Sequence, residues 1–109
     1  MRYLRPIPRR LLPDDMIVQL VEADGSRGES RLVRHVRFER SEEAVSDAHR
    51  SADAGRGTVY VDAVNSGGAF EVPAGSRVLV GAGPSMLVRA CRRCCVVRGQ
   101  VHHWELEVG

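Results

Sequence analysis

Short runs in which apolar and polar side chains alternate, separated by glycine-containing turns, recur along this 109-residue chain. The clearest run is Thr58–Val64, where Val59, Val61 and Ala63 share one side and β-branched residues are enriched. A period of two residues predicts strands that bury one face. Six such strands are expected, at Met16–Ala23, Leu32–Arg40, Thr58–Val64, Val78–Val80, Met86–Ala90 and Val101–Val108. The pattern predicts a mainly β fold, a small antiparallel barrel or sandwich of five to six strands.

The length of the chain allows a single hydrophobic core. A chain of this size buries roughly 65% of its unfolded surface, which is enough for one domain and too little for two. The connection Gly81–Ser85 is typical of a hairpin, so the strands on either side of it should pair antiparallel. On the last strand we expect Trp104, Leu106 and Val108 to face inward.

Residues 1–15 differ from the rest of the chain in their proline content. Pro6, Pro8 and Pro13 lack backbone amides and have a fixed φ, which favours an extended arm over a helix or a central strand. Apolar and basic residues lie between these prolines, which predicts that the arm covers a surface. The docking candidates are Pro6, Ile7, Pro8, Arg9, Arg10, Leu11, Leu12 and Pro13. Residues 16–109 are then the barrel domain.

The segment at about 41–57 interrupts the strand pattern and is weakly apolar. Ser41 followed by Glu42 and Glu43 is typical of a helix N-terminus, where a hydroxyl caps and acidic residues complement the dipole. A mobile loop fits the same residues equally well. We therefore expect a flexible insertion that contains either one short helix or a long loop.

All 16 basic residues are arginine, and the formal net charge is only +2. Arginine suits bidentate pairing with carboxylates and phosphates, although a GC-rich coding bias gives the same composition. The overall charge does not indicate a nucleic-acid binder. A basic arm with Arg2, Arg5, Arg9 and Arg10 on a small barrel keeps a nucleic-acid-binding module as an alternative, through nonspecific phosphate contacts.

Other function classes are disfavoured by missing motifs. The longest apolar stretch is interrupted by glycine, proline and serine, so no membrane span is expected, and the proline-rich start does not resemble a secretion signal. The chain has no phosphate-binding glycine loop with a lysine, no nucleophile elbow and no helical His-Glu-x-x-His motif. We expect neither an enzyme nor a cofactor.

Three cysteines are clustered near the C-terminus, in a number and spacing that do not suit a secreted disulfide framework and instead indicate a reducing compartment. Thiolate and imidazole are common zinc ligands, which makes Cys91, Cys94, Cys95 and His102 candidates for a zinc site. Because His102 and His103 are adjacent on an expected strand, they should point to opposite faces, so only one could join the cysteines. The alternative is that the cysteines are small apolar strand residues.

Four segments, in order along the chain, resemble one protein family. They are Pro6–Pro13, Tyr60–Ser66, Gly75–Val78 and His102–Glu105. Together they are similar to the minor capsid or head-completion proteins of long-tailed DNA phages. The resemblance implies a β-barrel subunit of the phage neck, a head-closure or stopper protein that is part of the virion at the head–tail junction. The match is weakest at Gly81–Gln100.

The resemblance also implies partners and roles. The protein is expected to assemble in the cytoplasm of the bacterial host as a homo-oligomeric ring, a dodecamer in the family. The ring lies below the portal and adaptor and above a tail or tail-terminator protein, and retains packaged double-stranded DNA. The arm should dock on the adaptor or a neighbouring subunit. The channel-facing candidates are Ser41, Glu42, Glu43, Asp47, His49, Arg50, Asp53 and Arg56. Another neck component, similar to an adaptor or tail terminator, is the alternative.

Overall fold

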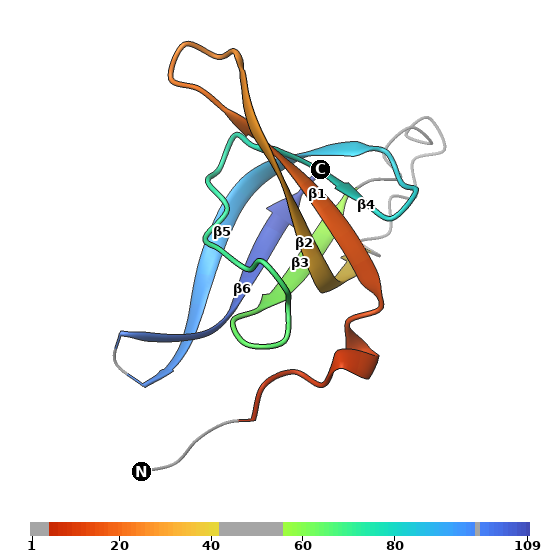
Figure 1. Cartoon of the computed structure of the whole chain (residues 1–109), viewed down its shortest axis with the longest axis vertical. Helices are drawn as coiled ribbons and strands as arrows, with labels where there is room; N and C mark the ends of the chain where they lie inside the picture. The colour runs from red at the N-terminus through yellow and green to blue at the C-terminus, as the bar shows by residue number, and fades with distance from the viewer. Residues whose placement is uncertain (1–4, 42–55, 98) are drawn as a thin grey trace.

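Six antiparallel strands close into a barrel in the computed structural model, which describes residues 5–41, 56–97 and 99–109 (Figure 1). The strands are β1 (Asp14–Val21), β2 (Arg27–Arg40), β3 (Gly57–Asp62), β4 (Arg77–Val80), β5 (Ser85–Val97) and β6 (Gln100–Val108). Their order around the barrel is β1-β2-β3-β6-β5-β4, and β4 pairs with β1. The predicted mainly β fold with a small antiparallel barrel is confirmed.

The barrel consists of two three-stranded meanders. β1, β2 and β3 follow one another in the first, and β4, β5 and β6 in the second. The pairs β3–β6 and β1–β4 join the meanders, so that every strand has a neighbour on both sides. Closure removes the unpaired backbone groups that an open sheet leaves at its edges. The expected antiparallel hairpin of β4 and β5 is also confirmed.

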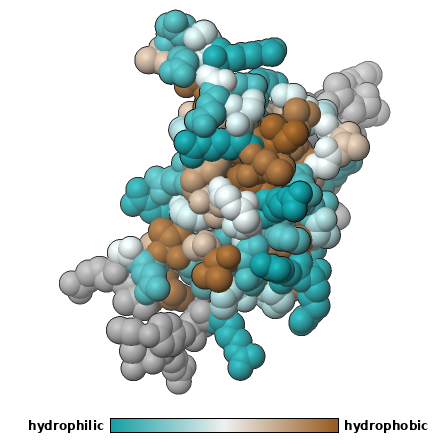
Figure 2. Space-filling view, viewed as in Figure 1, coloured by the Kyte–Doolittle hydropathy of each residue, from teal (hydrophilic) through white to brown (hydrophobic). Residues whose placement is uncertain are grey.

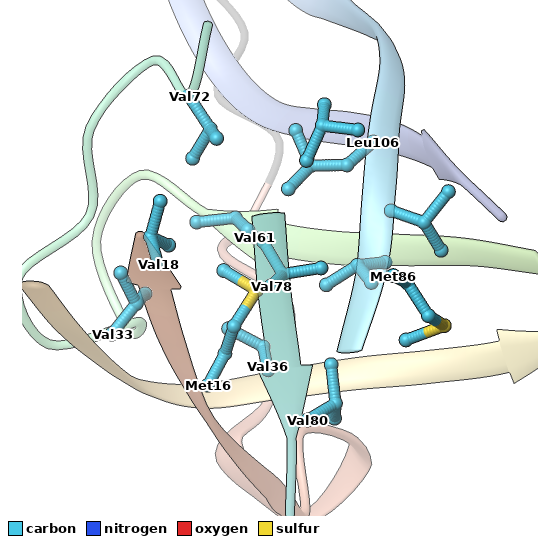
Figure 3. Packing of buried hydrophobic residues seen from close by; sticks show 13 residues of the cluster. Met16, Val18, Val33, Val36, Val61, Val72, Val78, Val80, Met86 and Leu106 are labelled. Carbon is cyan, nitrogen blue, oxygen red and sulfur yellow. The ribbon is translucent and has the colours of Figure 1, made fainter. Parts of the chain in front are cut away.

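Valine dominates the barrel interior, and Figure 3 shows these side chains pointing toward one another from opposite walls. A barrel of so few strands has a narrow interior, which small β-branched side chains fill well. Leu106 and Val108 are fully buried and Trp104 packs against the same cluster, as predicted. The buried cluster consists of Met16, Val18, Val33, Val36, Val59, Val61, Val72, Val78, Val80, Met86, Val88, Leu106 and Val108.

A bulge in β2 changes which of its side chains are buried. The alternation predicted opposite faces for Val33 and Val36, yet both are fully buried. The register with β1 shifts between Val33 and Val36, and His35 between them has a φ of 58°. An extra residue on one strand reverses the alternation after it, which returns Val36 to the interior.

Several strand boundaries differ from the predicted ones. β5 continues through the cysteines to Val97 because it pairs with β6 over most of that length. β1 begins at Asp14, inside the predicted arm, and the arm contains a 3-10 turn, η1 (Arg9–Leu11). β3 ends at Asp62, whose carboxylate accepts the amides of the following turn.

The stem of the 41–57 insertion continues the β2–β3 hairpin. Arg40 is opposite Gly57, and the Ser41 amide donates to the Arg56 carbonyl at 2.9 Å. Gly57 is required at this stem, because an added Cβ would overlap the Glu39 carbonyl oxygen and the Phe38 ring. Residues 42–55 lie outside the described residues, and with them the choice between a helix and a loop. Among the described residues, no helix is long and apolar enough to cross a membrane.

Residues 63–76 cross from β3 to β4 over one end of the barrel (Figure 1), and Glu71 attaches this connection to the β5–β6 hairpin. The Arg93 guanidinium donates to both Glu71 oxygens, and Trp104 Nε1 donates to Oε1 at 3.2 Å. These donors, the Arg93 hydrogen bond first, lower the pKa of Glu71. Next to Glu71, Val72 enters the core and closes this end of the barrel.

The pH dependence of stability should reveal the Glu71 contacts. The folded-state pKa of Glu71 lies below the ordinary value of 4.5, so its contribution is present above pH 4.5 and is lost as the pH falls through the folded-state pKa. We expect Glu71→Gln to lower the melting temperature at pH 7, and the difference from wild type to disappear at strongly acidic pH. Glu29→Gln, which removes a surface pair within β2, should have little effect at either pH. A difference for Glu71→Gln that persists unchanged in acid would contradict this assignment.

Candidate functional site

The N-terminal arm, residues 5–13, runs below the strands in the view of Figure 1, and hydrogen bonds tie it to the barrel from Arg5 onward. Side chains from β6 and from the turn after β3 hold its backbone. His102 Nε2 is 2.8 Å from the Arg5 carbonyl, the Ile7 amide donates to Asp62 Oδ1 at 2.9 Å, and Asn65 Nδ2 donates to the Ile7 carbonyl at 2.8 Å. The first part of the arm therefore has a fixed path.

Asp62 is the centre of this attachment. Its side chain points away from the core, yet it is fully buried because the arm covers it. One carboxylate oxygen accepts the Ile7 amide, and the other accepts the amides of Val64 and Asn65 at 2.9 and 2.7 Å. A buried carboxylate is stabilised when several donors satisfy it. The same side chain ends β3 and fixes the arm.

The predicted docking residues of the arm divide into two groups. Pro8, Arg9, Arg10, Leu11 and Pro13 are exposed and Pro6 and Ile7 are half-buried, whereas Leu12 is 1% exposed. Leu12 is therefore buried within this chain, between the arm and the barrel, which does not fit its expected role as a docking residue. An open cleft of about 330 Å³ lies between the arm and the outer side of the barrel; it is lined by Ile7, Leu11, Leu12, Arg37, Glu39 and Tyr60.

Of the predicted channel-facing residues, only the two at the stem are described. Ser41 and Arg56 are exposed and pair through their backbones at the end of the β2–β3 hairpin. Glu42, Glu43, Asp47, His49, Arg50 and Asp53 lie outside the described residues.

The three cysteines do not converge as the predicted zinc ligand set requires. Cys91 lies opposite Leu106 and packs against the core, and burial is the main cause that raises its pKa. Cys95 is exposed, and Cys94 is half-buried opposite His103. Successive residues of a strand point to opposite faces, which separates these thiols. The four predicted ligands Cys91, Cys94, Cys95 and His102 therefore do not form one site, and the structure groups Cys94 with other side chains instead.

Cys94, His103 and Glu105 form a cluster in which one ligand atom from each residue lies within 4.8 Å of the others; we call this the thiol–histidine cluster. His103 and Glu105 are two residues apart on β6 and share its outer face, and Cys94 is the cross-strand partner of His103. His103 Nε2 is 3.1 Å from Glu105 Oε2. The sequence carried a signal for this set, because alternation on the last strand places His103 and Glu105 on one side.

A bulge in β6 brings His102 to the same cluster. Cys94 is opposite His103 but Cys95 is opposite Val101, so His102 is an extra residue. The two imidazole rings meet edge to face, with their Nδ1 atoms 2.8 Å apart. The prediction that His102 and His103 point to opposite faces is wrong, because the bulge places both side chains on the same side of β6.

Hydrogen bonding and burial shift the pKa values within the cluster. The His103 hydrogen bond is the main cause that lowers the pKa of Glu105. Burial, followed by the hydrogen bond to Glu105, raises the pKa of the Cys94 thiol. Arg92 adds an exposed cation, 3.7 Å from the Glu105 carboxylate. The cluster thus combines a carboxylate, an imidazole and a thiol, three side chains that can bind a metal.

A second surface feature, on β1, β2 and β4, is apolar. Ile17 lies opposite Leu79 on β4 and opposite Leu32 on β2, and the three side chains are 46%, 40% and 50% exposed. We call these three residues the apolar row. Figure 2 shows hydrophobic atoms gathered over this face of the barrel. Arg27 and Arg77 line an open groove of about 250 Å³ together with Ile17 and Leu79.

Replacing Asp62 should loosen the arm and destabilise the barrel. Asp62→Ala leaves three backbone amides without their acceptor, and we expect a loss of about 2–4 kcal/mol in the free energy of unfolding, measured by urea denaturation. The Ile7 amide should also exchange its hydrogen faster. Val64→Ala, at a 70% exposed side chain in the same turn, should stay within about 0.5 kcal/mol of wild type. Equal stability of both variants would refute the role given to Asp62.

The arm, the thiol–histidine cluster and the apolar row are the three candidate sites of the described surface. The first two meet at His102, whereas the apolar row lies on other strands. Comparisons of the chain with protein-family models, with curated proteins and with solved structures gave no match.

Proposed function

We propose that this chain is a structural subunit of the neck of a long-tailed DNA phage, a head-closure or stopper protein. The observation that carries the proposal is the meeting of three of the four segments on which the resemblance rests. Tyr60–Ser66 pairs with His102–Glu105 across β3 and β6; the first segment binds the backbone of Ile7, within Pro6–Pro13, and the second binds the Arg5 carbonyl just before it. The hydrogen bonds that hold the arm in this unit join residues 55 to 97 positions apart in the chain.

This unit fixes the path of the arm along the barrel. Asp62, Asn65 and His102 fix the backbone at Arg5 and Ile7, and the following residues Pro8–Leu11 remain exposed. A segment that is already ordered loses less conformational entropy when it binds. We infer that Pro8–Leu11 contacts the adaptor above the ring.

Ring formation requires contacts between barrel walls, because a closed barrel has no edge to which a neighbouring strand could add. The apolar row, bordered by Arg27 and Arg77, supplies one such wall, and we assign it to a second copy of this chain. β6 is across the barrel from β1 and carries Glu107 together with Glu105, which pairs with Arg92. Two different walls on opposite sides suit the head-to-tail contacts of a ring.

The remaining parts of the proposal follow from the resemblance. The ring, a dodecamer in the family, would sit below the portal and adaptor and above a tail or tail-terminator protein. The insertion between Ser41 and Arg56 would reach the channel and contact packaged DNA without sequence preference. The protein would act at the head–tail junction of the virion, after assembly in the bacterial cytoplasm.

The presence of the polypeptide in virions tests this function directly. In a phage that encodes this chain, we expect mass spectrometry of purified particles to detect it and labelling to place it between capsid and tail. Disruption of its gene should give heads that package DNA, release it and carry no tail, and a plasmid copy should restore joining. Heads that keep their DNA without the protein would favour another neck component, and virions that lack it would refute the proposal.

The apolar row can be tested separately from the location of the protein. Ile17→Glu combined with Leu79→Glu should keep the monomer folded by circular dichroism, because both side chains point away from the core, and should abolish ring assembly and complementation. The control is Val64→Glu, at the more exposed Val64 outside the row, which should assemble as wild type. Light scattering after size exclusion measures the oligomer. Assembly of the double variant, or equal failure of the control, would exclude this surface.

A further inference from the structure

We propose that Cys94, His103 and Glu105 bind a divalent transition-metal ion of the zinc type. The site does not rest on the proposed function, since its three ligands are argued from the geometry of β5 and β6 and from the contact of His102 with the arm. It differs from the ligand set that the sequence suggested, because only Cys94 is common to both.

The spacing of the three side chains is close to that of a metal site. Zinc bonds of about 2.0–2.3 Å in a tetrahedron separate neighbouring ligand atoms by about 3.3–3.8 Å. His103 Nε2 and Glu105 Oε2 are already 3.1 Å apart, and all three ligand atoms lie within 4.8 Å of one another. A water molecule can take the fourth position.

The hydrogen-bond network shows which nitrogen of His103 faces the cluster. The Arg5 carbonyl can only accept, so His102 Nε2 donates to it, and a neutral His102 then presents an unprotonated Nδ1. His103 Nδ1, 2.8 Å away, must therefore carry a proton and donate it. His103 Nε2 is then the ring nitrogen that faces the Glu105 carboxylate, at 3.1 Å, and it is the atom that an ion bound between the two side chains would contact.

The contacts around His103 match those of established metal-binding histidines. Such a histidine usually donates its second ring N–H to an acceptor that fixes the tautomer and orients the ring. His102 is that acceptor here, and it is itself held by the Arg5 carbonyl. His102 is therefore a positioning residue for the metal, not a ligand.

The chemistry of the donors selects the class of ion. A thiolate and an imidazole favour zinc and related transition metals over calcium or magnesium, which prefer oxygen ligands. The three side chains are half-buried, so an ion could enter from solvent. The neighbouring Arg92 is 75% exposed and can swing away from Glu105 when a cation binds.

Metal binding by the purified full-length protein tests the site. The protein, stripped of metal under reducing conditions, is titrated with Co²⁺ and with Zn²⁺ against a chromophoric chelator. We expect one ion per chain and a Co²⁺–thiolate charge-transfer band. Cys94→Ser should remove the band, and His103→Ala and Glu105→Gln should weaken Zn²⁺ binding at least about tenfold. His102→Ala should weaken it about 10- to 100-fold while the thiolate band remains.

Matched controls on the same strands separate this site from other metal binding. Cys95→Ser and Glu107→Gln change the neighbouring thiol and the next outward carboxylate of β6, and both should bind Zn²⁺ as wild type. Circular dichroism of each variant confirms folding, and the conservative Glu105→Gln serves if Cys94→Ser does not fold. Absence of the band in the wild-type protein, or its loss in Cys95→Ser or Cys91→Ser, would overturn the proposed ligand set.

Discussion

β3 and β6 pair along six residues, from Gly57 opposite Val108 to Asp62 opposite His103. This contact joins the last strand of one meander to the last strand of the other and, with β1–β4, closes the barrel. It also places Asp62 next to the histidines of β6. The attachment of the arm depends on it, because Asp62 and Asn65 lie at the end of the first meander whereas His102 belongs to the second. Loss of this pairing would open the barrel and separate the two groups of side chains that hold the arm.

Two bulges adapt the regular barrel to these features. The bulge at His35 returns Val36 to the interior after Val33, so β2 keeps its core contacts while its direction changes. The bulge at His102 instead points an imidazole outward, toward the surface and the arm. Extra residues of this kind re-aim side chains without ending a strand. In this chain one bulge serves packing and the other serves the surface cluster.

The arm contains the proposed docking segment and also contacts the proposed metal site through His102. Its first residues are tied to β6 and to the turn after β3, and its middle is exposed for a partner. A metal ion on His103 would hold His102 in its acceptor role and thereby stiffen the hydrogen bond to the Arg5 carbonyl. The proposed metal and the proposed docking segment would then be coupled through a single imidazole. The apolar row lies on β1, β2 and β4 and provides a surface separate from this pair.

Local alternation by itself determined the strands and the inward orientation of Leu106 and Val108, because a side-chain period of two is a local property. The connection Gly81–Ser85 determined the antiparallel hairpin. Prolines likewise predicted an arm, although not that Leu12 would be buried between the arm and the barrel. Tertiary structure alone decided the closure of the barrel, the burial of Asp62 beneath the arm and the replacement of Cys91 and Cys95 by His103 and Glu105 around Cys94. These depend on strand register and on bulges, which are set by long-range pairing between β3, β5 and β6 rather than by neighbouring residues.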